Sequence, residues 1–574
     1  MQKFLTTVSA AALGLVLTVS APAPVSAESL AGSYLAGRNA SARNDFEIAA
    51  GYYATALARD STNAELMESA TLSHLALGNI DKALPLAKQI LSQGHRSQVA
   101  RMVTTAGLVD DGDFEALVAQ GIRSEGISPW IDGLVKAWAL IGMDDVYGAL
   151  AQFDAVSDDT GMRGIVQFHK ALALATLGRY ADAEALFEGE TLGAAARTRR
   201  GVMARVEILS QLDRNEDAVQ SIATAFSGAT DLELDALIAR LKKGERVPFN
   251  HAPTARAGIA EVFFTVASLL RSEQASAYFT LLHARVANHL RPDHVDAVLL
   301  TADLLEDLGQ YKLAIAEYRK VAADDPAYQV AELGRAAALR RLDKVDQAIE
   351  VLDQLARSHG DLAVVHSTLG DILRAQDEDQ AAILAYTKAL DLTEKDDTRA
   401  WFLYFSRGIA YSQDGDSVAA EDDFRAALAI NPDQPQVLNY LGYLLVEEQR
   451  KLDEALDMIE RAVAASPDSG YIVDSLGWVY YRLGRYDEAV VQMERAVELE
   501  AVDPVVNDHL GDVFWAVGRK REAQFQWKRA LSFVEFSTMD TEAEPDRIRR
   551  KLEVGLDAVL KEEGAAPLKV ANDD

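Results

Sequence analysis

Histidine and acidic side chains are the residues of this 574-residue chain whose types could form a metal or catalytic site. Three of its ten histidines, His283, His289 and His294, lie close together in sequence. On a helix with 3.6 residues per turn, intervals of six and then five residues do not bring three side chains to one face. These intervals also differ from the usual spacing of zinc ligands. We therefore predict no metal site.

Other motifs for chemistry are also missing. Asp414-Gly415-Asp416 resembles the start of a calcium loop, but its glycine is second rather than sixth, so the EF-hand pattern is not met. The sequence holds no GxxxxGK[ST], HExxH or GxSxG motif and no cysteine, which excludes disulfides and thiolate catalysis. We predict a protein without a cofactor that is not an enzyme. The alternative is an enzyme with an unrecognised site in the N-terminal region.

The charge balance restricts the class of partner. Lys and Arg number 57 against 88 Asp and Glu, a net charge of −31, while 49% of the residues are hydrophobic, as in folded soluble proteins. A surface this acidic repels phosphate backbones and anionic lipid headgroups. The composition therefore argues against nucleic acid and membrane-surface binding and favours basic or neutral protein partners.

The N-terminus has the pattern of an export signal. Lys3 precedes a short apolar stretch, Phe4 to Val19, and Val25-Ser26-Ala27 places small residues at a cleavage position. The apolar stretch is too short for a comfortable membrane span of ~20 residues, although an uncleaved anchor is the alternative. We predict that residues 1–27 are a signal peptide cleaved near Ala27, and that the mature protein is periplasmic without a membrane span.

The elements that would position any site are visible as an internal repeat. The motif Leu476-Gly477, Tyr480, Gly484 and Ala489 recurs 34 residues later, and related copies occur around Gly370, Gly408 and Gly442. The recurring set is Leu510-Gly511, Phe514, Gly518 and Ala523. Both the period and the residue types resemble the tetratricopeptide repeat family. The resemblance implies an all-α fold, a right-handed superhelical solenoid of antiparallel helix pairs.

The regularity of the repeat predicts the domain organisation. We expect a degenerate repeat array over 28–227, an irregular interruption over 228–260, and a regular array over 261–535. The interruption contains turn residues and no helical period between Lys242 and His251. Residues 536–574 are expected to hold a capping helix, from Pro545 to Glu563, followed by a tail, because terminal repeats need a polar cap.

The family resemblance also indicates a binding surface. In tetratricopeptide proteins the first helix of each pair lines a concave face that binds peptides or partner helices. By this resemblance the partner-binding residues are a mixture of aromatic, amide and acidic side chains: Asn439, Tyr443, Tyr471, Asp474, Trp478, Tyr481, Asp508, Asp512 and Trp515. The alternative is that these rings pack only between repeats.

A closer resemblance points to one functional class. The runs that begin at Asp474 and Asn507, together with Gly244-Glu-Arg-Val-Pro, look like a group of Gram-negative envelope proteins. One of these is a lipoprotein adaptor that brings substrates to a carboxyl-terminal processing protease, although this chain lacks a cysteine for lipidation. The resemblance implies a non-catalytic periplasmic scaffold or adaptor whose protein partners include an envelope protease and its substrates. An assembly factor for envelope or exopolysaccharide machinery is the alternative.

Overall fold

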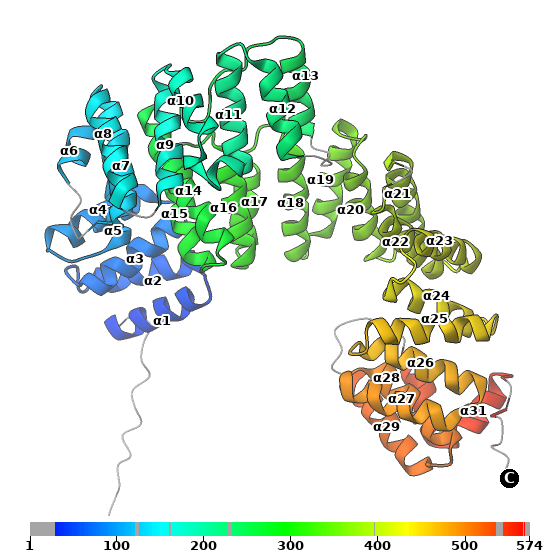
Figure 1. Cartoon of the computed structure of the whole chain (residues 1–574). Coiled ribbons are helices and arrows are strands. Elements are labelled where there is room, and N and C mark those ends of the chain that lie inside the picture. The colour runs from blue at the N-terminus through cyan, green and yellow to red at the C-terminus, as the bar shows by residue number, and fades with distance from the viewer. Residues whose placement is uncertain are drawn as a thin grey trace, which may run out of the picture. The chain divides into compact units, whose positions relative to one another are not determined.

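The computed structural model describes residues 29–120, 126–159, 162–226, 232–394, 397–534, 543–565 and 567–568. The signal peptide predicted for residues 1–27 lies outside these ranges. Every regular element in the described ranges is a helix, which confirms the predicted all-α class. The chain divides into two compact units, an N-terminal unit that ends at Lys344 and a C-terminal unit that begins at Val345 (Figure 1).

Both units are built from antiparallel helix pairs. The helices of the N-terminal unit are α1 (Leu30–Ala42), α2 (Phe46–Leu57), α3 (Ala64–Ala76), α4 (Ile80–Ser92), α5 (Gln98–Asp110), α6 (Phe114–Ala119), α7 (Pro129–Gly142), α8 (Val146–Asp159), α9 (Arg163–Thr176), α10 (Tyr180–Glu188), two short 3-10 turns (Glu190–Leu192 and Ala195–Arg197), α11 (Arg199–Gln211), α12 (Asn215–Ala225), α13 (Leu232–Lys242), α14 (Ala255–Ser272), α15 (Ala277–Leu290), α16 (Val295–Asp307), α17 (Tyr311–Tyr318) and α18 (Tyr328–Arg341). The helices of the C-terminal unit are α19 (Val345–Ser358), α20 (Ala363–Arg374), α21 (Asp379–Leu392), α22 (Ala400–Gln413), α23 (Ser417–Ile430), α24 (Pro435–Glu447), α25 (Leu452–Ala465), α26 (Gly470–Leu483), α27 (Tyr486–Leu499), α28 (Pro504–Ala516), α29 (Lys520–Val534), α30 (Pro545–Val554) and α31 (Leu556–Glu562).

The glycines that recur in the C-terminal helix pairs are explained by how the helices pack. Gly477 of α26 lies against Met493 of α27, and a Cβ atom there would come within 2.8 Å of the methionine side chain. Gly511 of α28 lies in the same way against the ring of Trp527 in α29. The turn that follows α26 ends at Gly484, whose φ of 77° is in the left-handed region that favours glycine. The glycines of the repeat motif therefore lie where two helices approach closely or where the chain turns tightly.

The N-terminal unit departs from a simple stack. After α13 the chain returns, and α14 packs against α7 and α9 while α15 packs against α3 and α5 (Figure 1). These partners are the first helices of successive pairs, and they are far from α14 and α15 in sequence. Trp138 of α7 is fully buried against Gly258 of α14, and Arg285 of α15 donates from Nε to the carbonyl oxygen of Ala76 at 2.8 Å. The unit therefore covers part of its own inner helix face.

The predicted interruption over 228–260 contains more order than the sequence indicates. Leu232–Lys242 form helix α13, and α14 begins at Ala255, so the non-helical segment within the described part of this range is residues 243–254. This segment is held by side chains of α11: Ser210 accepts from the Val247 backbone N–H, and Glu207 accepts from the N–H groups of Asn250 and His251. The segment is thus a fixed crossover that leads the chain back to α14.

The predicted capping helix from Pro545 to Glu563 is two helices. Gly555 has φ 87° and ψ 156°, which no α-helix accommodates, and α30 ends just before it. The apolar spacing across this segment continues through the break, so periodicity alone did not reveal it. The result is a bent pair in which α30 packs against α29. The pair contacts α28 through Lys551, Gly555 and Asp557.

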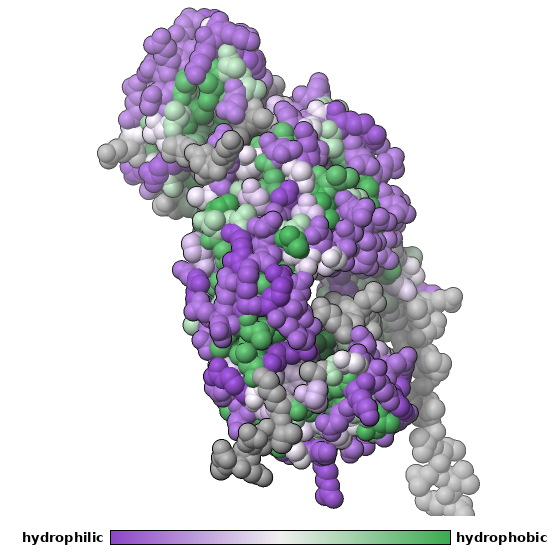
Figure 2. All heavy atoms as spheres, turned by 90° about the vertical axis from the view of Figure 1, so that its right-hand side faces the viewer, coloured by the Kyte–Doolittle hydropathy of each residue, from purple (hydrophilic) through white to green (hydrophobic). Residues whose placement is uncertain are grey.

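The surface of the described residues is mainly hydrophilic on the face that Figure 2 shows. Hydrophobic residues gather there in separate patches. Among the described residues, no helix combines the length and the low charge that a membrane span requires.

Candidate partner-binding surfaces

The nine residues predicted to bind partners lie on three consecutive first helices of the C-terminal unit. Asn439 and Tyr443 are on α24, four residues from Tyr471 to Tyr481 are on α26, and Asp508, Asp512 and Trp515 are on α28. Their exposure differs strongly. Tyr471 is 57% exposed, Asn439, Tyr443, Trp478 and Trp515 are half-buried, and the remaining four are buried. The structure therefore brings these residues onto one series of helices but leaves few of them open to a partner.

The two predicted carboxylates on α28 bind side chains of the same protein. Lys551 of α30 is fully buried, and its Nζ lies 2.7–2.8 Å from both oxygens of Asp512 and 2.9–3.0 Å from both oxygens of Asp508. Trp527 also donates from Nε1 to Asp512 at 2.9 Å. Burial raises the pKa of Asp508, although the neighbouring Lys551 opposes this shift. In this conformation the two carboxylates hold α30 in place.

The third carboxylate, Asp474, is paired as well. Its Oδ2 lies 2.9 Å from Nδ1 of His509. Burial disfavours the imidazolium ion, but Asp474 together with Asp508 and Asp512 more than offsets this effect, so the pKa of His509 is raised. The Trp478 ring stacks on His509 with centroids 4.1 Å apart and on Tyr481 at 4.8 Å. Much of this aromatic cluster therefore packs between repeats, as the alternative interpretation predicts.

Two exposed aromatic residues near Tyr471 in the series of first helices, Phe402 and Tyr440, were not identified from the sequence. Phe402 of α22 is 48% exposed and Tyr440 of α24 is 44% exposed, similar to Tyr471 of α26. Phe402 and Tyr471 occupy equivalent positions, each six residues before the glycine of its helix. Comparing equivalent positions across repeats would have found Phe402. We call Phe402, Tyr440 and Tyr471 the aromatic surface.

The three histidines considered for a metal site have separate partners. His283 bonds through Nδ1 to the carbonyl oxygen of Phe279, His289 contacts Asp110 at 2.6 Å, and His294 contacts Glu261 at 3.1 Å. No group of three side chains suited to a metal ion occurs among the described residues.

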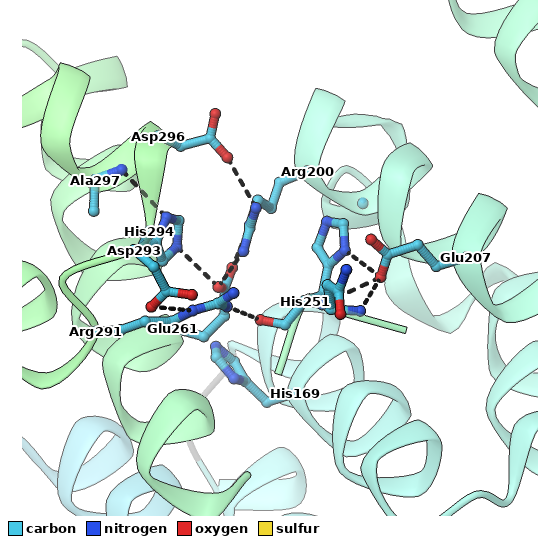
Figure 3. Close-up of polar contacts among 12 residues, drawn as sticks. His169, Arg200, Glu207, His251, Glu261, Arg291, Asp293, His294, Asp296 and Ala297 are labelled. Atoms are coloured by element: carbon cyan, nitrogen blue, oxygen red, sulfur yellow. Dashed lines mark hydrogen bonds and ion pairs between the residues drawn. The ribbon is translucent and has the colours of Figure 1, made fainter. Parts of the chain in front are cut away.

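A buried polar cluster lies in the N-terminal unit, where α9, α11, α14, α16 and the crossover segment meet (Figure 3). Arg200 of α11 binds the fully buried Glu261 of α14 through two hydrogen bonds of 2.8–2.9 Å and binds Asp296 of α16 at 2.8 Å. Burial would raise the pKa of Glu261, but Arg200 and His294 lower it well below its usual range. The ion pairs of this cluster join α11 to α14 and α16.

His169 of α9 lies beside this cluster and is fully buried. Trp138 donates from Nε1 to its Nδ1 at 3.3 Å, so the neutral ring carries its proton on Nε2, which has no partner among the described residues. Burial lowers the pKa of His169 from 6.5 to about 4. The folded unit therefore holds this imidazole neutral at pH values where the unfolded chain would protonate it.

The free energy of unfolding of the N-terminal unit is expected to depend on this histidine. Because the folded pKa is lower than the unfolded one, stability is complete above pH 6.5 and decreases as the pH falls toward 4, by about 3 kcal/mol from this group. Denaturant titrations from pH 7.5 to 4.5 should show a shallower decrease in His169→Asn, since asparagine can accept from Trp138 without titrating. Exchange of the exposed His95 for Asn is the control, and identical pH profiles for wild type and His169→Asn would contradict the assignment.

Comparison with known proteins agrees with the repeat pattern. The family described as "Tetratricopeptide repeat" matches residues 34–97, 134–200, 269–328, 333–397, 405–470 and 447–505, which is more than half of the chain. TPR repeat-containing protein PA4667 of Pseudomonas aeruginosa is 28% identical over 183 residues, a stretch that covers 32% of this chain and only 30% of that relative.

Two solved structures match this chain at low sequence identity. The crystal structure of the APC/C hetero-tetramer Cut9-Hcn1 matches with 16% identity and a TM-score of 0.38, covering 91% of this chain and 96% of that one. A tetratricopeptide repeat protein from Parabacteroides merdae matches with 16% identity and a TM-score of 0.37, covering 46% of this chain and 98% of that one. From the family match and the helix pairs of both units, the chain belongs to the tetratricopeptide repeat family.

Proposed function

We propose that this protein is a non-catalytic scaffold that binds a segment of a protein partner on the aromatic surface of the C-terminal unit. The observation that carries this proposal is the exposure of Phe402, Tyr440 and Tyr471 on three consecutive first helices, α22, α24 and α26. Exposed large rings that recur on one helix series are unusual for a surface that meets only water. Aromatic side chains of this kind supply most of the binding energy in many protein interfaces.

The charge of the C-terminal unit indicates the kind of partner. Residues 345–574 contain 46 acidic and 24 basic residues, a net charge of −22. Tyr471 lies close to Asp503 and Glu500, and its pKa is raised by burial and by these two carboxylates. A ring beside carboxylates favours apolar and cationic side chains. A partner segment with both kinds of side chain is therefore the best match.

The proposal extends to the cellular context. The export signal predicted from the sequence of residues 1–27 supports a periplasmic location. The resemblance to envelope proteins supports an adaptor that delivers substrates to an envelope protease. Such a role needs a rigid array that exposes one binding surface without altering the bound chain, and an array of helix pairs suits it.

Site-specific photo-crosslinking in cells tests the binding surface. A photoreactive residue at Tyr440 or Tyr471 should give a discrete crosslinked product with a partner protein. The same residue at Leu384 or Val418, which are exposed on the second helices α21 and α23, should not. These positions are matched controls because they lie in the same unit and are at least as accessible.

The partner recovered by crosslinking then allows an affinity measurement. Replacing Phe402, Tyr440 and Tyr471 together by serine should weaken binding more than tenfold, which requires only about 1.4 kcal/mol. These side chains are partly exposed, but Tyr440 also packs against Phe405 and Phe424, so the variant is compared with wild type only after its helicity shows that it is folded. Unchanged affinity in the folded variant would show that the aromatic surface is not the binding site.

A further inference from the structure

The inner face of α28 is occupied by a basic side chain of the same protein. Lys551 reaches from α30 to Asp508 and Asp512, and no part of its side chain is exposed. Four contacts of 2.7–3.0 Å join its Nζ to the two carboxylates, so this ammonium group is their main counterion. The pair of carboxylates therefore forms a built receptor for one ammonium group, and the structure shows it filled.

Other contacts hold α30 and α31 next to the two carboxylates, as contacts with a bound ligand would. Ile548, one helical turn before Lys551, is fully buried. Gly555 lies so close to Trp515 that a Cβ atom would come within 2.5 Å of the ring. Trp515 also donates from Nε1 to Asp557 of α31 at 2.9 Å. The face of α28 thus binds a segment with a buried apolar side chain, a buried ammonium group and backbone packed against the ring of Trp515.

Helix α30 supplies the positive charges that neutralise the two carboxylates of α28. Asp508 and Asp512 are both buried, and the cations that reach them are Lys551 and, at 3.7 Å from Asp512, Arg547. Helix α30 contains four basic residues, although the C-terminal unit to which it belongs has a net charge of −22. Removing α30 would leave two buried carboxylates without their ammonium partner, so an open receptor would attract a replacement cation.

We propose that the face of α28 is a binding site for a basic amphipathic helix of a partner protein, and that α30 occupies it as a resident ligand. The partner helix would carry an apolar residue and a lysine three positions apart, as Ile548 and Lys551 do. Because α30 is tethered, it competes at an effective concentration near the millimolar range, and a free helix binds well only when α30 is displaced or weakened. This inference rests on the proposed function only in taking the partner to be a protein. The two sites are separate, because the aromatic surface is formed by other helices.

Peptide binding to the full chain tests the proposal. The probe is a fluorescent peptide with the sequence of residues 545–563, and its control is the same peptide with alanine in place of Lys551. Lys551→Ala in the protein should weaken the resident contact, so this variant should bind the probe at least tenfold more tightly than the wild type does. Lys561→Ala, which removes an exposed lysine of α31, should bind like the wild type.

A second protein variant opens the site without changing a charge. Gly555→Ala introduces a Cβ against Trp515 at a positive φ, so it should displace α31 and also increase probe binding. Adding Asp508→Asn and Asp512→Asn to either variant should abolish the gain. Hydrogen exchange of α20 to α27 should stay at wild-type levels in each variant used.

The outcomes separate this proposal from the proposed function. Equal probe binding by wild type and both opened variants, or binding that survives loss of the two carboxylates, would show that α30 is only a structural cap. If Lys551→Ala unfolds α20 to α27, the result for Gly555→Ala decides. The serine variant of the aromatic surface should leave probe binding unchanged, because its residues lie on α22, α24 and α26.

Discussion

Replacing Glu261 by alanine is expected to lower the free energy of unfolding of the N-terminal unit by about 3–5 kcal/mol. The carboxylate is fully buried and receives two hydrogen bonds from Arg200 and a contact from His294. Its removal leaves the guanidinium of Arg200 with only the partly exposed Asp296 as a close partner. The loss therefore comes mainly from a cation that stays in the helix junction without its buried counterion.

Urea unfolding followed by circular dichroism measures this loss. Glu261→Gln should fall between wild type and Glu261→Ala, since the amide still accepts a hydrogen bond but does not balance the charge. Glu273→Ala removes an exposed carboxylate beside the C-terminal end of the same helix and should change stability by less than about 0.5 kcal/mol. Equal stabilities of the Glu261 and Glu273 variants would mean that the cluster contributes nothing to the junction.

Replacing Trp138 by alanine is expected to destabilise the same unit by about 3–5 kcal/mol and to loosen α14. The indole is fully buried between α7 and α14, packs edge-on against Phe153, and donates to His169 at 3.3 Å. Truncation leaves a large cavity where the returning helix crosses the first array, and it removes the hydrogen-bond donor of a buried imidazole.

Hydrogen exchange resolved by peptide measures the location of this effect. Protection should decrease in α14, Ala255–Ser272, although these residues are more than 100 positions away from Trp138 in sequence. Trp130→Ala on the same helix is the matched control, because this indole is only half-buried and should cost less. Loss of protection confined to α7 and its sequence neighbours would indicate that α14 does not depend on this contact.

The repeat fold was predictable from sequence because its determinants are local. Glycines such as Gly477 and Gly511 are required where two helices of one pair approach closely, and Gly484 is required by a left-handed turn. Each constraint acts within about one repeat, so the same residue types recur every 34 residues and the pattern can be read directly. The positions of the predicted binding residues on α24, α26 and α28 follow from the same period.

The accessibility of those residues depended on contacts that no period encodes. Asp508 and Asp512 contact Lys551, and Trp138 contacts α14, through packing between segments that the repeat period does not make neighbours. A local pattern assigns a side chain to a helix face, but only the tertiary structure determines whether another part of the chain covers that face. For this reason the sequence by itself determined the helix pairs and their order, and the tertiary structure determined which of their inner faces remain open to a partner.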